Sequence, residues 1–264
     1  VLSMWLWSQP CEHVKSNLMT EMSTQMTNEM EGITTTTNIS STGRENHIVT
    51  RLKIAILSYN DARVAHDILS NNTLTQLIRC NHEAYAQRYG YTYLSPDRSS
   101  ALWSASRFVL NGLRYKTFSI LSNFESYDVI VWIDHDAVFY NQALSIEYWL
   151  DHKMDAAADL LMAEDLPGYK FNAGLQIIKT SAWARKFYEN AIEDILKTAI
   201  DAVYLEQPIF YRLHDTMEGA SSKIQIYKPR SDFQAFLKVS TDFKNTSWVV
   251  HGTVCKSCDI GVYV

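Results

Sequence analysis

The chain has 264 residues, of which 47% are hydrophobic, and this length is sufficient for one substantial hydrophobic core. Its net charge is −5 and its basic residues are scattered, which argues against a nucleic-acid-binding surface. No apolar run approaches the roughly 20 residues that span a bilayer. Because the first residue is Val1 rather than methionine, we expect any membrane anchor to lie in a segment that is missing from this chain.

The first 50 residues differ in composition from the rest of the chain. Residues 19–42 are rich in Thr, Ser, Asn, Met and Glu and contain a run of four threonines, without any sustained apolar period. Such a composition cannot bury enough apolar surface to fold by itself. It predicts a disordered or stem-like segment over 1–50 and a folded domain over 51–264.

The first predicted elements of the domain are two strands with a helix between them. The apolar run 52–57 predicts a buried strand, which ends in the polar residues Ser58, Tyr59 and Asn60. A helix is expected to follow and to end near Tyr89, where Gly90 provides the stop. Residues 91–94 predict the second strand.

Later segments continue the alternation of strands and helices. An amphipathic stretch at about 103–124 precedes 129–133, the clearest buried strand of the sequence. Further strands are predicted at 159–163 and 174–179, and further helices at 181–199 and about 204–214. This order predicts an α/β fold with a single mixed, mostly parallel sheet flanked by helices. Ligands of such sheets gather beyond the carboxyl ends of the strands.

Asp134-His135-Asp136 directly follows the strand at 129–133. Two carboxylates in a half-buried crevice would repel each other, and a divalent cation would remove that cost. Carboxylate oxygens suit Mg²⁺ or Mn²⁺ bound to a diphosphate. The alternative is a solvated turn that binds no metal.

Four other segments carry polar residues with weaker signals. Asn172 and Gly174 lie at the start of the strand at 174–179, where Gly174 permits close approach of the backbone and Asn172 can hydrogen-bond hydroxyl groups. Glu206 and Gln207 open a late helix, His251 ends a short apolar run, and Lys256 follows five residues later. Taken singly, these are ordinary features: a turn, a helix start, a core histidine and a solvated charge.

The cysteines and the glycosylation sequons are compatible with more than one cellular compartment. Cys255 and Cys258 form a single Cys-X-X-Cys motif, which is too few ligands for a structural zinc, so a disulfide or free thiols are expected. Sequons at Asn38, Asn71 and Asn245 permit a luminal glycoprotein without requiring one.

In their order and spacing, these segments resemble glycosyltransferase family 34, a family of galactosyl-, mannosyl- and xylosyltransferases, over about residues 52–258. The resemblance is carried by Tyr89-Gly90-Tyr91, Lys116, Trp132-Ile133-Asp134-His135-Asp136-Ala137, Asp165, Phe171-Asn172-Ala173-Gly174 with Trp183, Glu206-Gln207, and His251 with Cys255-Lys256-X-Cys258. The last pattern is similar to the tail of the plant xylosyltransferase branch.

The resemblance implies a GT-A fold and a glycosyltransferase that moves a hexose or pentose from a nucleotide-diphosphate sugar, usually a UDP-sugar, to a glycan acceptor. It implies dependence on Mn²⁺ or Mg²⁺ and retention of anomeric configuration. Residues that the resemblance assigns to the metal are Asp134, Asp136 and His251. Residues assigned to the nucleotide sugar are Ser58, Tyr59 and Asn60 near the base, Lys116, Asp134 (metal or ribose), Asp165, Asn172 and Gly174 near the sugar, and Lys256 at the diphosphate. Glu206 and Gln207 are assigned to the reacting carbon.

The family also implies a location in the Golgi or endomembrane lumen as a type II membrane protein. The chain departs from the family pattern at Gly252, where relatives tend to have an aromatic residue, around Lys116, and in the short tail after Cys258. These departures bear on the acceptor more than on the metal. Two other functions stay open: a catalytically silent nucleotide-sugar- or glycan-binding protein of the same fold, and a metal-dependent phosphoester hydrolase.

Overall fold

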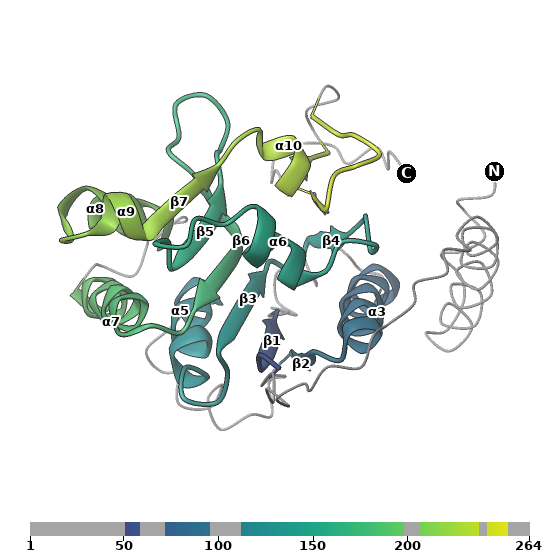
Figure 1. Ribbon diagram of the computed structural model, residues 1–264, viewed down its shortest axis with the longest axis horizontal. Helices are drawn as coiled ribbons and strands as arrows, with labels where there is room; N and C mark the ends of the chain where they lie inside the picture. Colours follow the sequence, from purple (N-terminus) through teal and green to yellow (C-terminus); the bar gives the residue numbers. More distant parts are fainter. Residues whose placement is uncertain (1–50, 59–71, 96–111, 198–205, 238–241, 253–264) are drawn as a thin grey trace, which may run out of the picture. The chain divides into compact units, whose positions relative to one another are not determined.

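The computed structural model describes residues 51–58, 72–95, 112–197, 206–237 and 242–252 (Figure 1). All of these except Arg51 belong to one compact unit, Leu52–Gly261. The segment 1–50 predicted to be stem-like lies outside the described residues. Within the described part of the chain, no helix is both long enough and apolar enough to cross a membrane.

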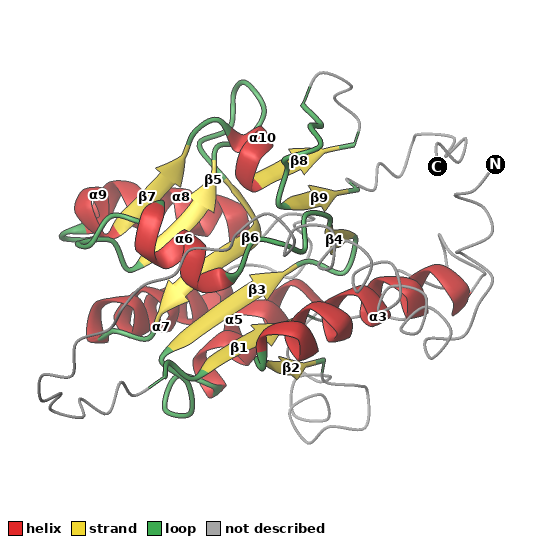
Figure 2. Cartoon of the chain, turned by 45° about the vertical axis from the view of Figure 1, so that its right-hand side comes forward, coloured by secondary structure: helices red, strands yellow, loops and turns green. Residues whose placement is uncertain are grey.

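A six-stranded sheet forms the centre of the unit, with the strand order β2-β1-β3-β6-β5-β7 (Figures 1 and 2). Its strands are β1 Ile54–Leu57, β2 Thr92–Leu94, β3 Val129–Ile133, β5 Leu160–Ala163, β6 Asn172–Lys179 and β7 Ile224–Tyr227. Strand β6 runs antiparallel to both of its neighbours, and the other pairs are parallel. The predicted mixed, mostly parallel sheet is confirmed.

Helices cover both faces of this sheet. Helices α5 (Gly112–Ser122), α7 (Ala182–Lys197) and α8 (Glu206–Thr216) pack on one face, where they meet Trp132 and other side chains of the central strands. Helices α3 (Asn72–Tyr89) and α6 (Ile146–His152) pack on the other face. The short helices are α9 Ala220–Lys223 and α10 Arg230–Phe233. Because both faces are covered, the inner strands are mainly apolar, and all five residues of β3 are buried.

A second, three-stranded sheet was not predicted from the sequence. It consists of β4 (Ala137–Phe139), β9 (Val249–His251) and β8 (Gln234–Phe236), in the order β4-β9-β8. Strands β4 and β9 are antiparallel, and Ala137 lies opposite His251. This register brings the end of the Asp-His-Asp segment beside a histidine from the far end of the chain.

Side chains of helix α3 form hydrogen bonds with the backbone of the edge strand β4. The side-chain amide of Asn81 donates to the carbonyl of Phe139 at 3.0 Å and accepts from its backbone N–H at 2.8 Å. The ring of His82 hydrogen-bonds the carbonyl of Ala137 at 2.8 Å. These contacts satisfy edge groups of β4 and fix the strand that follows Asp136.

The expected helix ends and strands agree with the structure to within a few residues. Helix α3 ends at Tyr89, and Gly90 adopts a positive φ of 70°, which L side chains rarely tolerate. Strand β3 has the predicted bounds. The first part of the amphipathic stretch at 103–124 lies outside the described residues, and its remainder forms α5.

We predict that His82 makes folding stability depend on pH. Burial disfavours the charged ring and lowers the pKa of His82 from 6.5 to about 4, although the bond to Ala137 opposes this shift. Between these values the unfolded chain binds more protons than the folded chain, so stability decreases as pH falls through this window. Through His82 alone, the free energy of unfolding should decrease by about 2 kcal/mol from about pH 7 to about pH 5.

Urea unfolding of the wild type and of His82→Gln at both pH values measures this contribution. The variant should show a smaller pH dependence, whereas the matched substitution of the exposed His152 should leave it unchanged. Equal pH dependence in wild type and His82→Gln would contradict the assignment.

Candidate metal and nucleotide-sugar site

The candidate residues gather at one edge of the central sheet. Asp134 follows β3, Ser58 follows β1, and Asp165 lies two residues beyond β5. Because these three strands are parallel, their carboxyl ends share an edge. Strand β6 is antiparallel and therefore begins at the same edge, with Asn172 and then Gly174. The local topology thus explains why distant residues meet there.

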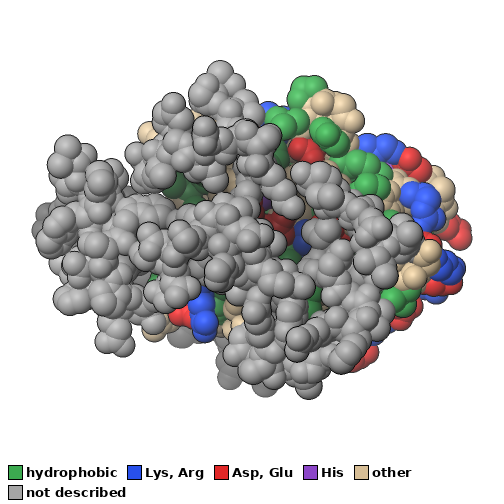
Figure 3. Space-filling model, turned by 180° about the vertical axis from the view of Figure 1, so that it is seen from behind, with side chains coloured by type: hydrophobic (Ala, Val, Ile, Leu, Met, Phe, Trp, Pro, Cys, Tyr) green, Lys and Arg blue, Asp and Glu red, His purple; other side chains and the backbone are tan. Residues whose placement is uncertain are grey.

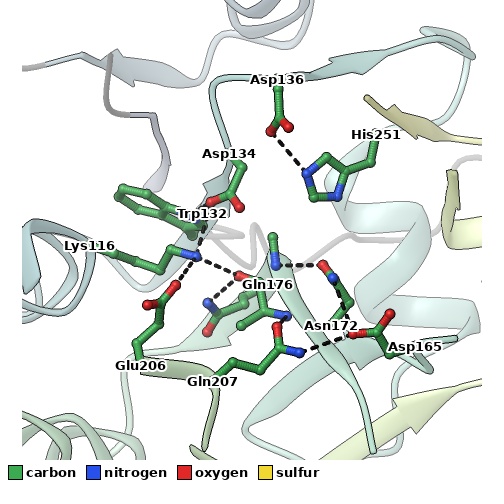
Figure 4. Close-up of polar contacts among 12 residues, drawn as sticks. Lys116, Trp132, Asp134, Asp136, Asp165, Asn172, Gln176, Glu206, Gln207 and His251 are labelled. Atoms are coloured by element: carbon green, nitrogen blue, oxygen red, sulfur yellow. Dashed lines mark hydrogen bonds and ion pairs between the residues drawn. The ribbon is translucent and has the colours of Figure 1, made fainter. Parts of the chain in front are cut away.

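Asp134, Asp136 and His251 form a group with the geometry of a metal site. Each offers one ligand atom, and these atoms lie within 4.8 Å of one another. Nε2 of His251 is 2.9 Å from Oδ1 of Asp136 (Figure 4). Two carboxylates and an imidazole are a suitable donor set for a divalent cation such as Mn²⁺. In the space-filling view from behind, acidic, basic and histidine atoms are visible together near the middle of the face (Figure 3).

Gly174 leaves room between these side chains. A Cβ at this position would lie 2.5 Å from Cε1 of His251, 2.8 Å from Oδ1 of Asn172 and 3.0 Å from Oδ2 of Asp134. Any larger residue would have to displace a buried ring or a carboxylate. The predicted close approach of the backbone at Gly174 is therefore present, and it lies beside the candidate metal ligands.

Lys116 is a buried cation shared by two acidic residues. Its Nζ lies 3.0 Å from Oδ1 of Asp134 and 3.3 Å from Oε1 of Glu206, and it donates to the carbonyl of Ala173 at 3.1 Å. Burial alone would lower the pKa of Lys116, but the two carboxylates raise it above its usual value. Lys116 therefore stays charged and holds the ends of β3, β6 and α8 together.

Trp132 completes the surroundings of Asp134. Its indole Nε1 donates to Oδ1 of Asp134 at 2.6 Å, and Nζ of Lys116 lies 5.4 Å from the centre of a Trp132 ring. Oδ1 of Asp134 thus contacts two donors, Trp132 and Lys116. The other oxygen of the carboxylate, Oδ2, lies beside Gly174. This arrangement orients the carboxylate toward Asp136 and His251.

Two residues assigned to the donor sugar, Asp165 and Asn172, are linked by hydrogen bonds to Gln207, which is assigned to the reacting carbon. Nε2 of Gln207 donates to Oδ2 of Asp165 at 3.0 Å and to the hydroxyl of Tyr211 at 2.6 Å. Asn172 Nδ2 also faces Oδ2 of Asp165, at 3.4 Å. The three assigned residues Asp165, Asn172 and Gln207 therefore lie together, beside the metal group (Figure 4).

Glu206 is buried, with 7% of its surface exposed. One carboxylate oxygen faces Lys116, and the other has no hydrogen-bond partner among the described residues. A buried carboxylate oxygen without a donor is costly, and a hydroxyl group or a developing positive charge next to it would relieve the cost.

The pair His251 and Asp136 is electrostatically coupled. Burial disfavours the charged ring, but the carboxylate of Asp136 overcomes this and raises the pKa of His251 above its usual value. Burial likewise opposes ionisation of Asp136, and His251 overcomes it and lowers the pKa of that carboxyl. At neutral pH Asp136 is therefore ionised and available as a ligand.

Not every assigned residue is placed. Tyr59, Asn60 and Lys256 lie outside the described residues, so their roles stay predictions. Ser58 is buried at the site edge, and its N–H donates to the carbonyl of Leu94, which leaves its predicted role beside the base open.

Two buried glutamines near the site were missed in the sequence. Gln234, the first residue of β8, contacts His251 and Asn172. Gln176 of β6 donates to the carbonyl of Ala173 at 2.8 Å and accepts from the hydroxyl of Tyr188 at 2.6 Å. Neither glutamine belongs to a recognisable motif. The one sequence feature that could have indicated them is a polar amide within an otherwise apolar strand.

No known protein-family model matches the sequence, and no curated protein matches it either. Solved structures do match in fold. A glycosyltransferase involved in glycosylation of the major capsid of PBCV-1 has a TM-score of 0.56 and 13% identity, over 77% of this chain and 95% of that one. The glycosyltransferase GlyE of Streptococcus pneumoniae TIGR4 matches with a TM-score of 0.49 and 13% identity, over 78% of this chain and 55% of that one. The galactosyltransferase LgtC, solved with donor and acceptor sugar analogues, matches with a TM-score of 0.43 and 14% identity, over 76% of this chain and 87% of that one.

The similarity at a TM-score of 0.56 confirms the expected fold, which is that of GT-A glycosyltransferases. At 13% identity it shows the fold and leaves the activity to be argued from the site. The more specific resemblance to glycosyltransferase family 34 stays an expectation.

We predict that Gly174→Ala disrupts the metal group while the protein still folds. The added methyl group must displace His251, Asn172 or Asp134, and overpacking of this kind costs about 1 to 3 kcal/mol of stability. Because ligand orientation changes, Mn²⁺ affinity should decrease by roughly tenfold or more. Calorimetric titration of the variant, with circular dichroism as the test of folding, measures both effects. Unchanged affinity would show that the glycine is not part of the site.

We also predict that Mn²⁺ affinity depends on protonation of His251. A metal ligand must be unprotonated, and the pKa of His251 is raised. Affinity should therefore decrease as pH is lowered from about 8 to about 6, because protons compete for the ring. His251→Gln should bind more weakly and lose most of this pH dependence. The same steep dependence in that variant would assign the titration to another group.

Proposed function

We propose that this protein is a glycosyltransferase that transfers a hexose or pentose from a nucleotide-diphosphate sugar, with a UDP-sugar as the favoured donor, to a glycan acceptor. The observation that carries the proposal is the convergence of Asp134, Asp136 and His251 beside Gly174, at the sheet edge where this fold binds ligands. The shared fold with a solved glycosyltransferase supports it.

The site fits a divalent cation by its donor chemistry. Four carboxylates belong to the site, those of Asp134, Asp136, Asp165 and Glu206, and Lys116 forms ion pairs with two of them, Asp134 and Glu206. A bound Mn²⁺ or Mg²⁺ would balance this charge and would stabilise negative charge on a departing diphosphate. Of the three candidate ligands, His251 is the one that favours Mn²⁺ over Mg²⁺.

Different residues serve the two halves of the donor in this proposal. Asp134, Asp136 and His251 face the diphosphate side, and Lys256 is proposed to contact the diphosphate directly. Asp165, Asn172 and Gln207, linked by hydrogen bonds, offer amide donors and carboxylate acceptors to sugar hydroxyls. Ser58, Tyr59 and Asn60 are proposed to bind the base.

Glu206 is proposed to act at the reacting carbon. In glycosyl transfer, positive charge develops at the anomeric carbon as the leaving group departs. Lys116 contacts one oxygen of Glu206, and the other oxygen, which has no hydrogen-bond partner among the described residues, would face that charge. Gln207, next in the chain, would orient the sugar. We propose same-face transfer, with retention of configuration, on the basis of the family resemblance.

The same resemblance supports a luminal location in the Golgi or endomembrane system, with a membrane anchor outside this chain. Asn245, in one of the three sequons, is exposed on a turn, which would allow a glycan there.

We predict that Asp136→Ala abolishes metal-dependent binding of nucleotide sugar and leaves the fold intact. The substitution removes one of the carboxylates in the group and the partner of His251. Titration of UDP into the wild type with Mn²⁺, into the wild type with EDTA, and into the variant measures the dependence. Only the first should show binding.

The matched control is Asp155→Ala. Asp155 is exposed and precedes β5, at the opposite edge of the sheet from the site, so binding should persist. Wild-type affinity for UDP that is indifferent to EDTA would contradict the metal assignment. A screen of UDP-galactose, UDP-xylose, UDP-glucose and GDP-mannose for sugar release and transfer then identifies the donor. Release of phosphate without any sugar transfer would support a phosphoester hydrolase instead.

A further inference from the structure

The side-chain amide of Gln207 forms hydrogen bonds at both of its ends. Its Nε2 lies 3.0 Å from Oδ2 of Asp165 and 2.6 Å from the hydroxyl of Tyr211 (Figure 4 shows the first of these contacts). Its Oε1 accepts from the N–H of Ala173 at 3.4 Å. Asp165 is a candidate residue of the site, whereas nothing in the sequence indicated Tyr211.

The backbone fixes the direction of these hydrogen bonds. A backbone N–H can only donate, so the Gln207 atom beside Ala173 is the oxygen. The other atom is therefore the nitrogen, and its two hydrogens point to Asp165 and Tyr211. A backbone carbonyl can only accept, and the hydroxyl of Tyr211 donates to the carbonyl of Phe171 at 2.9 Å. The hydroxyl oxygen of Tyr211 consequently accepts from Gln207.

Helix α8 and the start of β6 explain why these groups meet. Tyr211 lies four residues after Gln207 on α8, so the two side chains share one face of the helix. Phe171 directly precedes Asn172, the first residue of β6. The hydroxyl of Tyr211 therefore connects α8 to the point at which the chain enters β6.

Packing explains the ring of Tyr211 but not its hydroxyl. The ring packs edge-on against the buried ring of Phe171, with centroids 4.9 Å apart and an interplanar angle of 90°. A phenylalanine would make the same contact. Burial raises the pKa of Tyr211 above its usual value, so the hydroxyl keeps its hydrogen at neutral pH and can donate it. The two hydrogen bonds are what distinguish tyrosine from phenylalanine here.

The orientation of the amide decides what Gln207 offers to a ligand. Both hydrogens of Nε2 are used within the protein. Among the described residues, Oε1 accepts only the long hydrogen bond from Ala173, and a carbonyl oxygen can accept two. Held in this way, the amide presents an acceptor. Turned over, it would place Oε1 against the carboxylate of Asp165.

We propose that Tyr211 is a positioning residue, which holds the amide of Gln207 with its nitrogen on Asp165 and its oxygen available to the donor sugar. The inference rests on the proposed function for the identity of the ligand. It assigns Tyr211 no contact with the reacting atoms. Its effect on the reaction passes through the orientation of Gln207.

The first test needs no ligand. Tyr211→Phe removes the hydroxyl and keeps the ring. Hydrogen exchange of the Gln207 side-chain amide is measured in ¹H–¹⁵N spectra of the metal-free full chain, in which Gln207→Ala identifies the resonances. Exchange should be roughly 2- to 10-fold faster in Tyr211→Phe, the size expected for the loss of one hydrogen bond. Equal exchange in the wild type and the variant would overturn the proposal.

The same spectra of the wild type cover the case in which Tyr211→Phe fails to fold. The hydrogen-bonded amide of Gln207 should exchange more slowly than the amide of the exposed Gln87. Exchange at Gln207 as fast as that at Gln87 would show that the amide is not held and would sink the proposal.

The second test asks whether Tyr211 acts through Gln207. Release of sugar from UDP-galactose, UDP-xylose, UDP-glucose and GDP-mannose with Mn²⁺ is measured for the wild type, Tyr211→Phe, Gln207→Ala and the double variant. For the donor that the wild type uses, Tyr211→Phe should lower kcat/KM roughly 2- to 10-fold. In the Gln207→Ala background it should cause no further loss, because its effect passes through the residue already removed.

An equal loss in both backgrounds, or no loss in the wild-type background, would contradict the positioning role. The matched control is Tyr89→Phe. Tyr89 is half-buried, donates its hydroxyl hydrogen to the carbonyl of Gln142 at 2.8 Å, and precedes β2 at the sheet edge opposite the site. This variant should keep wild-type exchange at Gln207 and wild-type release of sugar.

These results are distinct from failure of the proposed function. In that case the wild type releases no sugar from any of the four donors, whereas the exchange of the Gln207 amide still shows whether Tyr211 holds it.

Discussion

The pairing of β4 with β9 is the contact on which the candidate site depends. The backbone N–H of Gly252 donates to the carbonyl of Asp136 at 2.7 Å, and Ala137 lies opposite His251. This register places the imidazole 2.9 Å from a carboxylate that is 115 residues away in the sequence. Because side chains alternate along a strand, a shift of one residue would turn His251 to the other face and remove it from the group.

The local charge balance explains the residues that surround this pair. Carboxylates brought together in a half-buried place repel one another unless cations lie between them. Lys116 separates Asp134 from Glu206, and His251 faces Asp136. These contacts reduce the repulsion without removing it, since two carboxylates share one lysine. The remaining negative charge would favour binding of the divalent cation that the proposed function requires.

The large features of the fold could be predicted because they depend on long apolar runs. Strand β3 and the helices around it follow from the sequence, and so does the position of Asp134 and Asp136 after the strand. The direction of β6 could not be predicted, because an apolar run has the same pattern in parallel and antiparallel pairs. The resemblance to known glycosyltransferases, rather than periodicity, indicated that His251 would lie beside Asp136.

The small sheet and its support were beyond sequence reasoning for a physical reason. Strands of three residues such as β4 and β8 are too short to show an alternating pattern. The contacts that Asn81 and Gln234 make depend on tertiary placement, and no local motif marks them. Residues that hold a site in place are therefore harder to predict than residues that form it.

Pulsed electron paramagnetic resonance of Mn²⁺ bound to the wild type with UDP tests the central claim most directly. The claim is that one cation contacts His251 and the diphosphate together. The account predicts ¹⁴N coupling from an imidazole that disappears in His251→Gln, together with ³¹P coupling from the diphosphate, in the same bound species. Mn²⁺ that shows phosphorus coupling with no nitrogen coupling would contradict it.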